Sequence, residues 1–143
     1  MKKSTIILLL IVFLGSVIIV GVFGMQAIPI DSRVYVTDII PTSVVTIDGQ
    51  SLEIKKGESA DYYYVMLPYE EGLTVIISTR IEPVDSTNKE LTITIDNNKE
   101  DNPLAKIGEK GEILILRRGT VRLHYSSKDS ATFKGMDFRI YTY

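Results

Sequence analysis

The segment HYSSKDS brings together three side chains that could do hydrolytic chemistry: His124, Ser126 and Asp129. A serine, a histidine and an acid are the groups of a nucleophilic hydrolase. On an expected strand, however, the Cβ atoms of His124 and Ser126 lie about 7 Å apart on one face, beyond direct hydrogen-bond reach. Asp129 suits the cap of a turn. We therefore expect His124 to be an ordinary surface residue and the protein not to be an enzyme.

Metal and cofactor chemistry has little support in the composition. The chain has one histidine and no cysteine, so disulfides, thiol nucleophiles and cysteine-ligated zinc are excluded. One histidine cannot supply the three or four protein ligands of a zinc site without a dense cluster of carboxylates. No glycine-rich phosphate-binding motif precedes a helix. We expect no catalytic residues and no catalytic cofactor.

Two short motifs are candidates for contact with a partner. In Tyr62, Tyr63 and Tyr64, the first and third share one face of an expected strand, and an exposed tyrosine suits contact with protein or glycan. The alternative is cross-strand packing of tyrosine on an exposed sheet. The basic turn at Arg117 and Arg118 could meet an anionic glycan or a lipid head group. Its alternative is a solvated hairpin tip.

These motifs lie in a region of short, alternating strands. After residue 32, turn signals recur every 8–12 residues or so, as in an all-β sandwich or barrel. Asp48 and Gly49 mark a hairpin turn. In TVRLHYS and MDFRIYT, apolar residues alternate with polar ones, which predicts two strands that are each buried on one face. We expect an antiparallel, jelly-roll-like β-sandwich of about 8–9 strands.

Two stretches of this β-rich region resemble families of extracellular β-sandwich domains. The stretch Leu73–Tyr143 resembles the later part of a CUB domain, through the strand VRLHYS, the turn at Asp129 and Ser130, and Gly135 before the last strand. The stretch SLEIKKGESADYYYVMLP looks like the entry of a bacterial pre-peptidase C-terminal domain. Both resemblances imply an extracytoplasmic recognition module without catalysis.

The CUB resemblance also implies a calcium ion. Glu82 and Asp129 fall where two of that family's calcium-binding acids would lie, and Glu90 is near the place of a third. The family's cysteine pairs are missing. Because calcium prefers six to eight oxygen ligands, the alternative is two solvated turn acids. We expect no cofactor, with a calcium ion at these acids as the alternative.

The N-terminal segment differs in composition from the rest. No charged residue follows Lys3 until Asp31, and at about 1.5 Å per residue the apolar stretch Thr5–Met25 would cross a hydrocarbon core of about 30 Å. We expect a transmembrane signal-anchor over residues 1–27 and an extracytoplasmic domain over 28–143. Lys2 and Lys3 would stay inside the cell. A cleaved signal peptide and a pilin-like helix are the alternatives.

These features together indicate a function. The net charge is −2, which gives no sign of nucleic-acid binding. We expect a single-pass cell-membrane protein whose sandwich, extracellular or periplasmic, binds other proteins or glycans of the cell envelope. The alternative is an accessory subunit of a larger membrane complex, with the sandwich covering its extracellular side.

Overall fold

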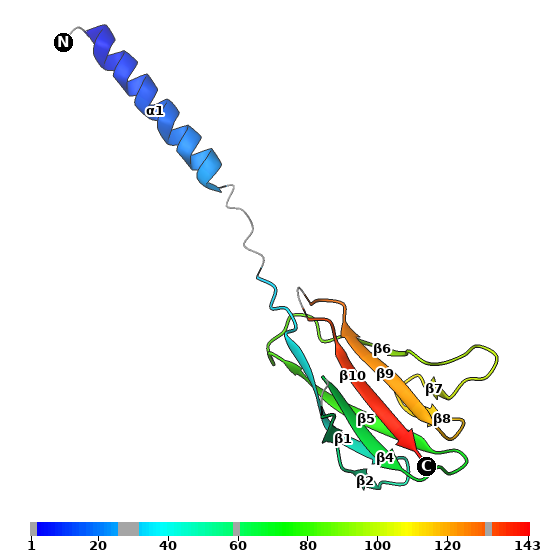
Figure 1. Cartoon of the computed structure of the whole chain (residues 1–143). Helices are drawn as coiled ribbons and strands as arrows, with labels where there is room; N and C mark the ends of the chain where they lie inside the picture. Colours follow the sequence, from blue (N-terminus) through cyan, green and yellow to red (C-terminus); the bar gives the residue numbers. More distant parts are fainter. Residues whose placement is uncertain (1–2, 26–31, 59–60, 131–132) are drawn as a thin grey trace. The chain divides into compact units, whose positions relative to one another are not determined.

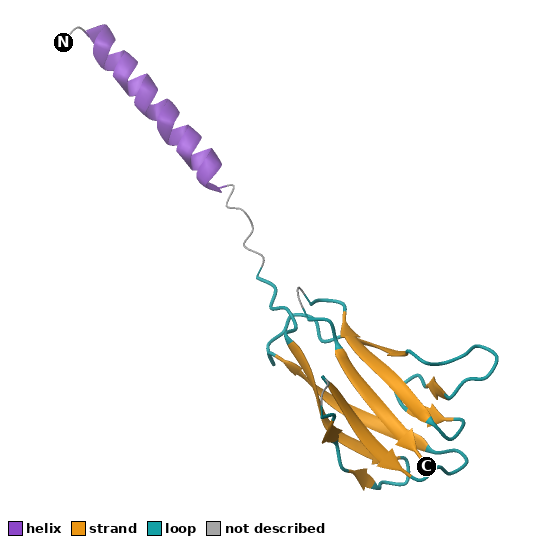
Figure 2. Ribbon diagram, in the orientation of Figure 1, coloured by secondary structure: helices purple, strands orange, loops and turns teal. Residues whose placement is uncertain are grey.

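The computed structural model describes residues 3–25, 32–58, 61–130 and 133–143 (Figures 1 and 2). The chain divides into two compact units, Met1–Ser32 and Arg33–Tyr143. Lys2 and the expected boundary at residue 28 lie outside the described residues.

The first unit contains one helix, α1 (Lys3–Met25). Its side chains are described as far as Ile18, and the large apolar ones among them are exposed, from 49% at Ile6 to 69% at Phe13. They occupy consecutive positions, so they cover every side of the helix. Over the described residues, no helical segment combines the length and the hydropathy that crossing a bilayer requires.

The second unit is built from ten strands in two five-stranded sheets (Figure 1). The strands are β1 (Asp38–Thr46), β2 (Ser51–Leu52), β3 (Lys55–Lys56), β4 (Tyr62–Leu67), β5 (Thr74–Glu82), β6 (Leu91–Ile95), β7 (Ala105–Ile107), β8 (Ile113–Ile115), β9 (Thr120–Ser127) and β10 (Met136–Thr142). The first sheet has the order β2-β1-β5-β8-β7, and the second has the order β3-β4-β10-β9-β6. The all-β, sandwich-like fold is therefore confirmed, and the count exceeds the expected 8–9 because β2 and β3 have only two residues each.

The alternating sequences form the strands that they predict. In β9 the side chains of Val121, Leu123 and Tyr125 are buried, and in β10 those of Phe138 and Ile140 are completely so. Their neighbours in sequence point away from the core. The turn at residues 47–48 also forms as expected, because β1 and β2 pair as a hairpin.

One strand pair departs from the expected antiparallel arrangement. β10 pairs with β9 in antiparallel fashion but with β4 in parallel, so it is the central strand of the second sheet. A parallel pair needs a long connection between its strands, and residues 68–135 supply one. Local alternation cannot reveal this pairing, because it is the same for a strand of either direction.

The core lies between the two sheets. Fully buried side chains of the first sheet, such as Ile39 and Val75, belong to one apolar cluster with Val65, Phe138 and Ile140 of the second. Burial of this kind is worth about 1.5–3 kcal/mol for each large side chain. The core holds the inner face of the second sheet in place, which leaves its outer face free to present functional groups.

Candidate functional site

The outer surface of the second sheet carries four of the residues named from the sequence: Tyr62, Tyr64, His124 and Ser126. Strands β4, β10 and β9 lie side by side in it (Figure 2). Their outward side chains are Tyr62, Tyr64, Met66, Arg122, His124, Ser126, Asp137, Arg139 and Tyr141. We call this surface the outer face.

The strand register arranges the outer face in rows. In one row Asp137 lies between Tyr62 on β4 and His124 on β9. In the next row Arg139 lies between Tyr64 and Arg122. Adjacent positions across a sheet have Cβ atoms about 4.5–5.5 Å apart, so each row brings its side chains into contact distance. Residues of three separate chain segments therefore meet on one rigid surface.

Three tyrosines form a cluster at the β4 side of the outer face. The ring centroids of Tyr62 and Tyr64 are 6.2 Å apart. Those of Tyr64 and Tyr141 are 5.6 Å apart, with the rings at 86° in an edge-to-face arrangement. Such geometry is favourable for aromatic pairs. We call these three residues the tyrosine cluster.

Arg139 connects the members of the tyrosine cluster. Its Cζ atom lies 3.8 Å from the ring centroid of Tyr62, which is a close cation–π contact. Its Nη1 donates a hydrogen bond to the hydroxyl of Tyr141 at 3.4 Å. This hydrogen bond lowers the pKa of Tyr141 below its ordinary value, and it raises the pKa of Arg139. A hydrogen bond with Tyr141 and slight desolvation raise the pKa of Tyr62.

A hollow of about 420 Å³ lies against the cluster, lined by all three tyrosines together with Gly57, Glu58 and Met66. Gly57 allows close packing there, because a Cβ atom in its place would lie 2.6 Å from Cε1 of Tyr62. Met66 is 53% exposed, which adds an apolar surface that no described residue covers. The hollow thus has aromatic, apolar and acidic walls.

The middle tyrosine of the YYY motif, Tyr63, lies on the opposite face of β4. Tyr63 points to the inner side of the sheet and packs against the core cluster. Its ring centroid is 5.8 Å from Nζ of Lys56 on the neighbouring β3. Of the three tyrosines predicted as partner contacts, the structure therefore places Tyr62 and Tyr64 together on the outer face and Tyr63 on the other.

The basic turn predicted as a contact lies between β8 and β9. The guanidinium of Arg117 donates hydrogen bonds to the carbonyl oxygens of Asn102 at 2.7 Å and Pro103 at 3.4 Å. These hydrogen bonds connect Arg117 to the preceding polar loop, so this side chain stabilises the loop. Arg118 beside it is exposed.

The two acids predicted to bind calcium lie at one end of the sandwich. Two consecutive backbone amides connect them. The amide of Val36 donates a hydrogen bond to the carbonyl oxygen of Asp129, and the amide of Thr37 donates one to the carbonyl oxygen of Glu82. The Glu82 carboxylate pairs with Arg80 at 2.8 Å. Within the described residues, neither acid belongs to a group of three potential metal ligands. Glu90, the approximate third acid, pairs instead with Lys128 at 3.4 Å. Calcium binding there remains a prediction.

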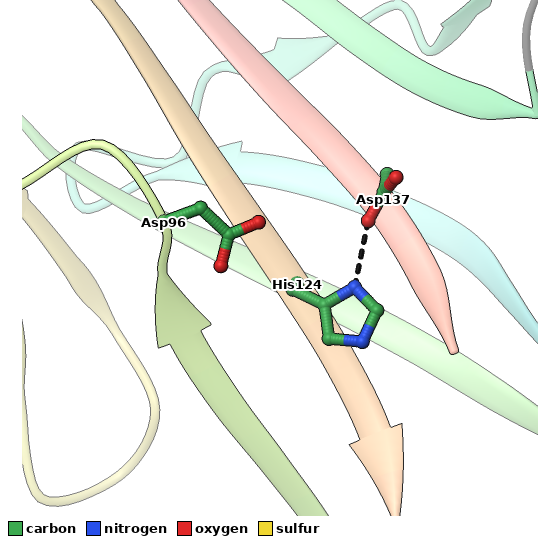
Figure 3. Close-up of side chains that lie close together, drawn as sticks. All are labelled: Asp96, His124 and Asp137. Carbon is green, nitrogen blue, oxygen red and sulfur yellow. Dashed lines mark hydrogen bonds and ion pairs between the residues drawn. The ribbon is translucent and has the colours of Figure 1, made fainter. Parts of the chain in front are cut away.

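A second cluster on the outer face lies toward β6 and contains the histidine. His124 and Asp137 are directly opposite one another on β9 and β10, and their Nδ1 and Oδ1 atoms are 2.7 Å apart. Asp96, just after β6, completes the group (Figure 3). One potential ligand atom from each residue lies within 4.8 Å of the other two. We call these three residues the His–Asp cluster.

The neighbours of His124 along the chain did not reveal this cluster, because both aspartates lie in other strands or turns. Asp137 could have been found, since the pairing of the last two strands places it opposite His124. Asp96 could not, because its position depends on the pairing of β6 with β9, in which Thr94 is opposite His124. A zinc site at the one histidine was expected to need a dense cluster of carboxylates, and two carboxylates lie beside His124.

No protein-family model matches this sequence, and no curated protein matches it either. What the fold and the site define is a two-sheet β-sandwich whose second sheet presents an aromatic and charged outer face.

Proposed function

We propose that the chain is a membrane-anchored, extracytoplasmic binding module without catalytic activity, and that the tyrosine cluster is its contact surface. The observation that carries this proposal is the position of Tyr62, Tyr64 and Tyr141 around a hollow on an exposed sheet face. Its partners would be proteins or glycans of the cell envelope.

Tyrosine suits such a surface for physical reasons. Each ring offers a large apolar area with few rotatable bonds, and each hydroxyl can exchange hydrogen bonds with a polar partner. Arg139 adds a fixed positive charge and planar donors between two of the rings. Because all these groups stand on paired strands, little conformational entropy is lost when a partner binds.

The membrane anchor is supported by the sequence and by the surface of α1. Residues 4–30 carry no charge. The described apolar side chains of α1 are exposed on every side, and a helix of that kind requires an apolar environment around it. Lys2 and Lys3 would keep the N-terminus inside, with the sandwich outside. The resemblance to CUB and pre-peptidase C-terminal domains supports a jelly-roll-like module of this location.

Photo-crosslinking in intact cells tests the contact surface. A photoreactive amino acid replaces Met66, which lines the hollow, and in a matched variant it replaces Ile76, which is exposed on β5 of the other sheet. We expect a specific adduct with an envelope protein or glycan from position 66, and none from position 76. Equal adducts from both positions would refute the proposed contact surface.

Photo-crosslinking also distinguishes the binding module from the alternative, an accessory subunit of a membrane complex. There, a photoreactive group at Phe13 on α1 would form a stoichiometric adduct with one membrane protein, and position 66 would form none. In the binding-module case, position 13 would give only lipid adducts.

The absence of cysteine provides a clean test of location. A single Glu100→Cys substitution in the exposed polar loop creates the only thiol of the chain. A maleimide that cannot cross membranes should label this thiol without disruption of the inner membrane. Labelling only after lysis would overturn the extracytoplasmic placement.

A further inference from the structure

We propose that Asp96, His124 and Asp137 form a binding site for a divalent transition-metal ion of the zinc class. The proposal does not depend on the tyrosine cluster or on the membrane anchor. It rests on the donor set, on the separation of the donors and on the direction of the imidazole ring.

The donor set is that of a zinc ion with an open position. Zinc binds imidazole nitrogen and carboxylate oxygen at about 2.0–2.2 Å, and two such ligands around one tetrahedral ion lie about 3.4 Å apart. In the His–Asp cluster, His124 supplies nitrogen and each aspartate supplies oxygen, all within 4.8 Å of one another. Rotation of the exposed Asp96 side chain would close the remaining distance, and water would occupy the fourth position.

The three ligands are held by a paired backbone. Asp137 and His124 are cross-strand partners. The backbone amide of Asp96 donates a hydrogen bond to the carbonyl oxygen of Arg122, two residues before His124, at 2.9 Å. The carboxylate of Asp96 turns toward the histidine side of the cluster (Figure 3). His124 and Asp137 are on neighbouring strands, which keep the spacing of ligands better than loops do, and Asp96 directly follows β6.

The ring nitrogen directed at the cluster is Nδ1, and Gly135 lies beside the other nitrogen: a Cβ atom at Gly135 would be only 2.6 Å from Nε2 of His124. Nδ1 faces Asp137 at 2.7 Å. Coordination through Nδ1 requires a neutral ring that carries its proton on Nε2 and donates the Nδ1 lone pair to the ion.

Neighbouring charges favour a transition metal over calcium or magnesium. Arg122 and Arg139 line a hollow of about 170 Å³ together with Asp96 and Asp137. The two cations offset the charge of the carboxylates, which weakens purely electrostatic attraction for a hard ion. Calcium also needs six to eight oxygens, and three protein donors fall short. Imidazole coordination adds affinity for zinc, copper and nickel that calcium cannot share.

The chain offers an unusually direct measurement. Because His124 is the only histidine, it produces the only imidazole signals in a long-range ¹H–¹⁵N spectrum. The full chain is purified in detergent without a polyhistidine tag and titrated with ZnCl₂, CaCl₂ and MgCl₂. We expect one zinc ion per chain, a large shift of the Nδ1 signal, a small shift of Nε2, and no response to calcium or magnesium.

Matched variants identify the ligands. Asp96→Asn removes one ligand but leaves the His124–Asp137 hydrogen bond in place, so the domain should keep its Tm while zinc affinity falls by more than about tenfold. Asp101→Asn removes the same charge from an exposed loop outside the cluster and should leave the affinity unchanged. Absence of zinc binding to the natural chain, a dominant shift of Nε2, or equal affinity in both variants would each overturn the proposal.

Discussion

The guanidinium of Arg139 lies over the ring of Tyr62, with 3.8 Å between Cζ and the ring centroid. The two residues come from β10 and β4, separated by most of the domain's length. Their contact exists because these strands pair in parallel at the centre of the second sheet. The same guanidinium also donates a hydrogen bond to the hydroxyl of Tyr141, so one arginine contacts two of the three members of the tyrosine cluster.

Replacement of this arginine should change how Tyr141 titrates. The hydrogen bond from Arg139 is the largest of the effects that lower the pKa of Tyr141. In Arg139→Gln, the pKa of Tyr141 should therefore rise toward the ordinary value of about 10. An NMR titration of ¹³C-labelled tyrosines measures this shift. Arg80→Gln, whose side chain pairs with Glu82 on β5, is the matched control and should leave Tyr141 unaffected.

The two faces of β10 should respond differently to truncation. Phe138 is 0% exposed, so Phe138→Ala should lower the free energy of unfolding by about 3–5 kcal/mol, through lost burial and the cavity that remains. Tyr141→Ala on the outer face should cost about 1 kcal/mol or less. Chemical denaturation of both variants makes the comparison. Equal losses would show that β10 is not a core strand with one buried face.

Replacement of Tyr125 by phenylalanine should leave the stability of the domain unchanged or raise it. Its ring is 2% exposed, and no described residue accepts or donates a hydrogen bond at its hydroxyl. An unsatisfied buried polar group costs about 1–3 kcal/mol, so Tyr125→Phe should leave the stability unchanged or raise it by about that amount. Thermal denaturation at neutral pH checks this, with the exposed Tyr143→Phe as control. A clear drop in Tm would indicate that the hydroxyl is satisfied.

The same tyrosine should make the domain sensitive to alkali. Burial raises the pKa of Tyr125 in the folded state, whereas the unfolded chain ionises near pH 10. The stability due to this difference is complete below about pH 10 and is lost as the pH rises toward the folded pKa. Tyr125→Phe should therefore lose less stability than the natural chain between pH 9 and about pH 11. Parallel curves for the two proteins would contradict this account.

Gly135 should tolerate no side chain. Its φ of +106° is a conformation that other residues rarely adopt, and a Cβ atom there would meet the carbonyl oxygen of Tyr125 and the ring of His124. Gly135→Ala should cost roughly 1–3 kcal/mol from strain, plus the displacement of His124. Gly72→Ala is the matched control, because Gly72 also has a positive φ (+78°) but open space around it. Denaturation should show the larger loss at position 135.

Much of the local structure could be predicted from the sequence. Alternation in TVRLHYS and MDFRIYT identified which side chains of β9 and β10 are buried, because side chains of a strand point to opposite faces with a period of two. Asp48 and Gly49 indicated the first hairpin, since a glycine with a φ of +86° completes its turn. These features depend only on residues close together in the chain.

The composition of the outer face depended on contacts between distant segments. The sequence placed Tyr62 and Tyr64 on one face, but only the parallel pairing of β4 with β10 put Arg139 and Tyr141 beside them. Likewise, only the pairing of β6 with β9 brought Asp96 near His124. Such pairings are selected by burial of the common core, weighed against the entropy of closing long loops. The sequence pattern along the chain contains neither the burial of the core nor the entropy of loop closure. The sequence alone therefore determined which side chains each strand presents on each face, and the tertiary structure decided which of these side chains meet.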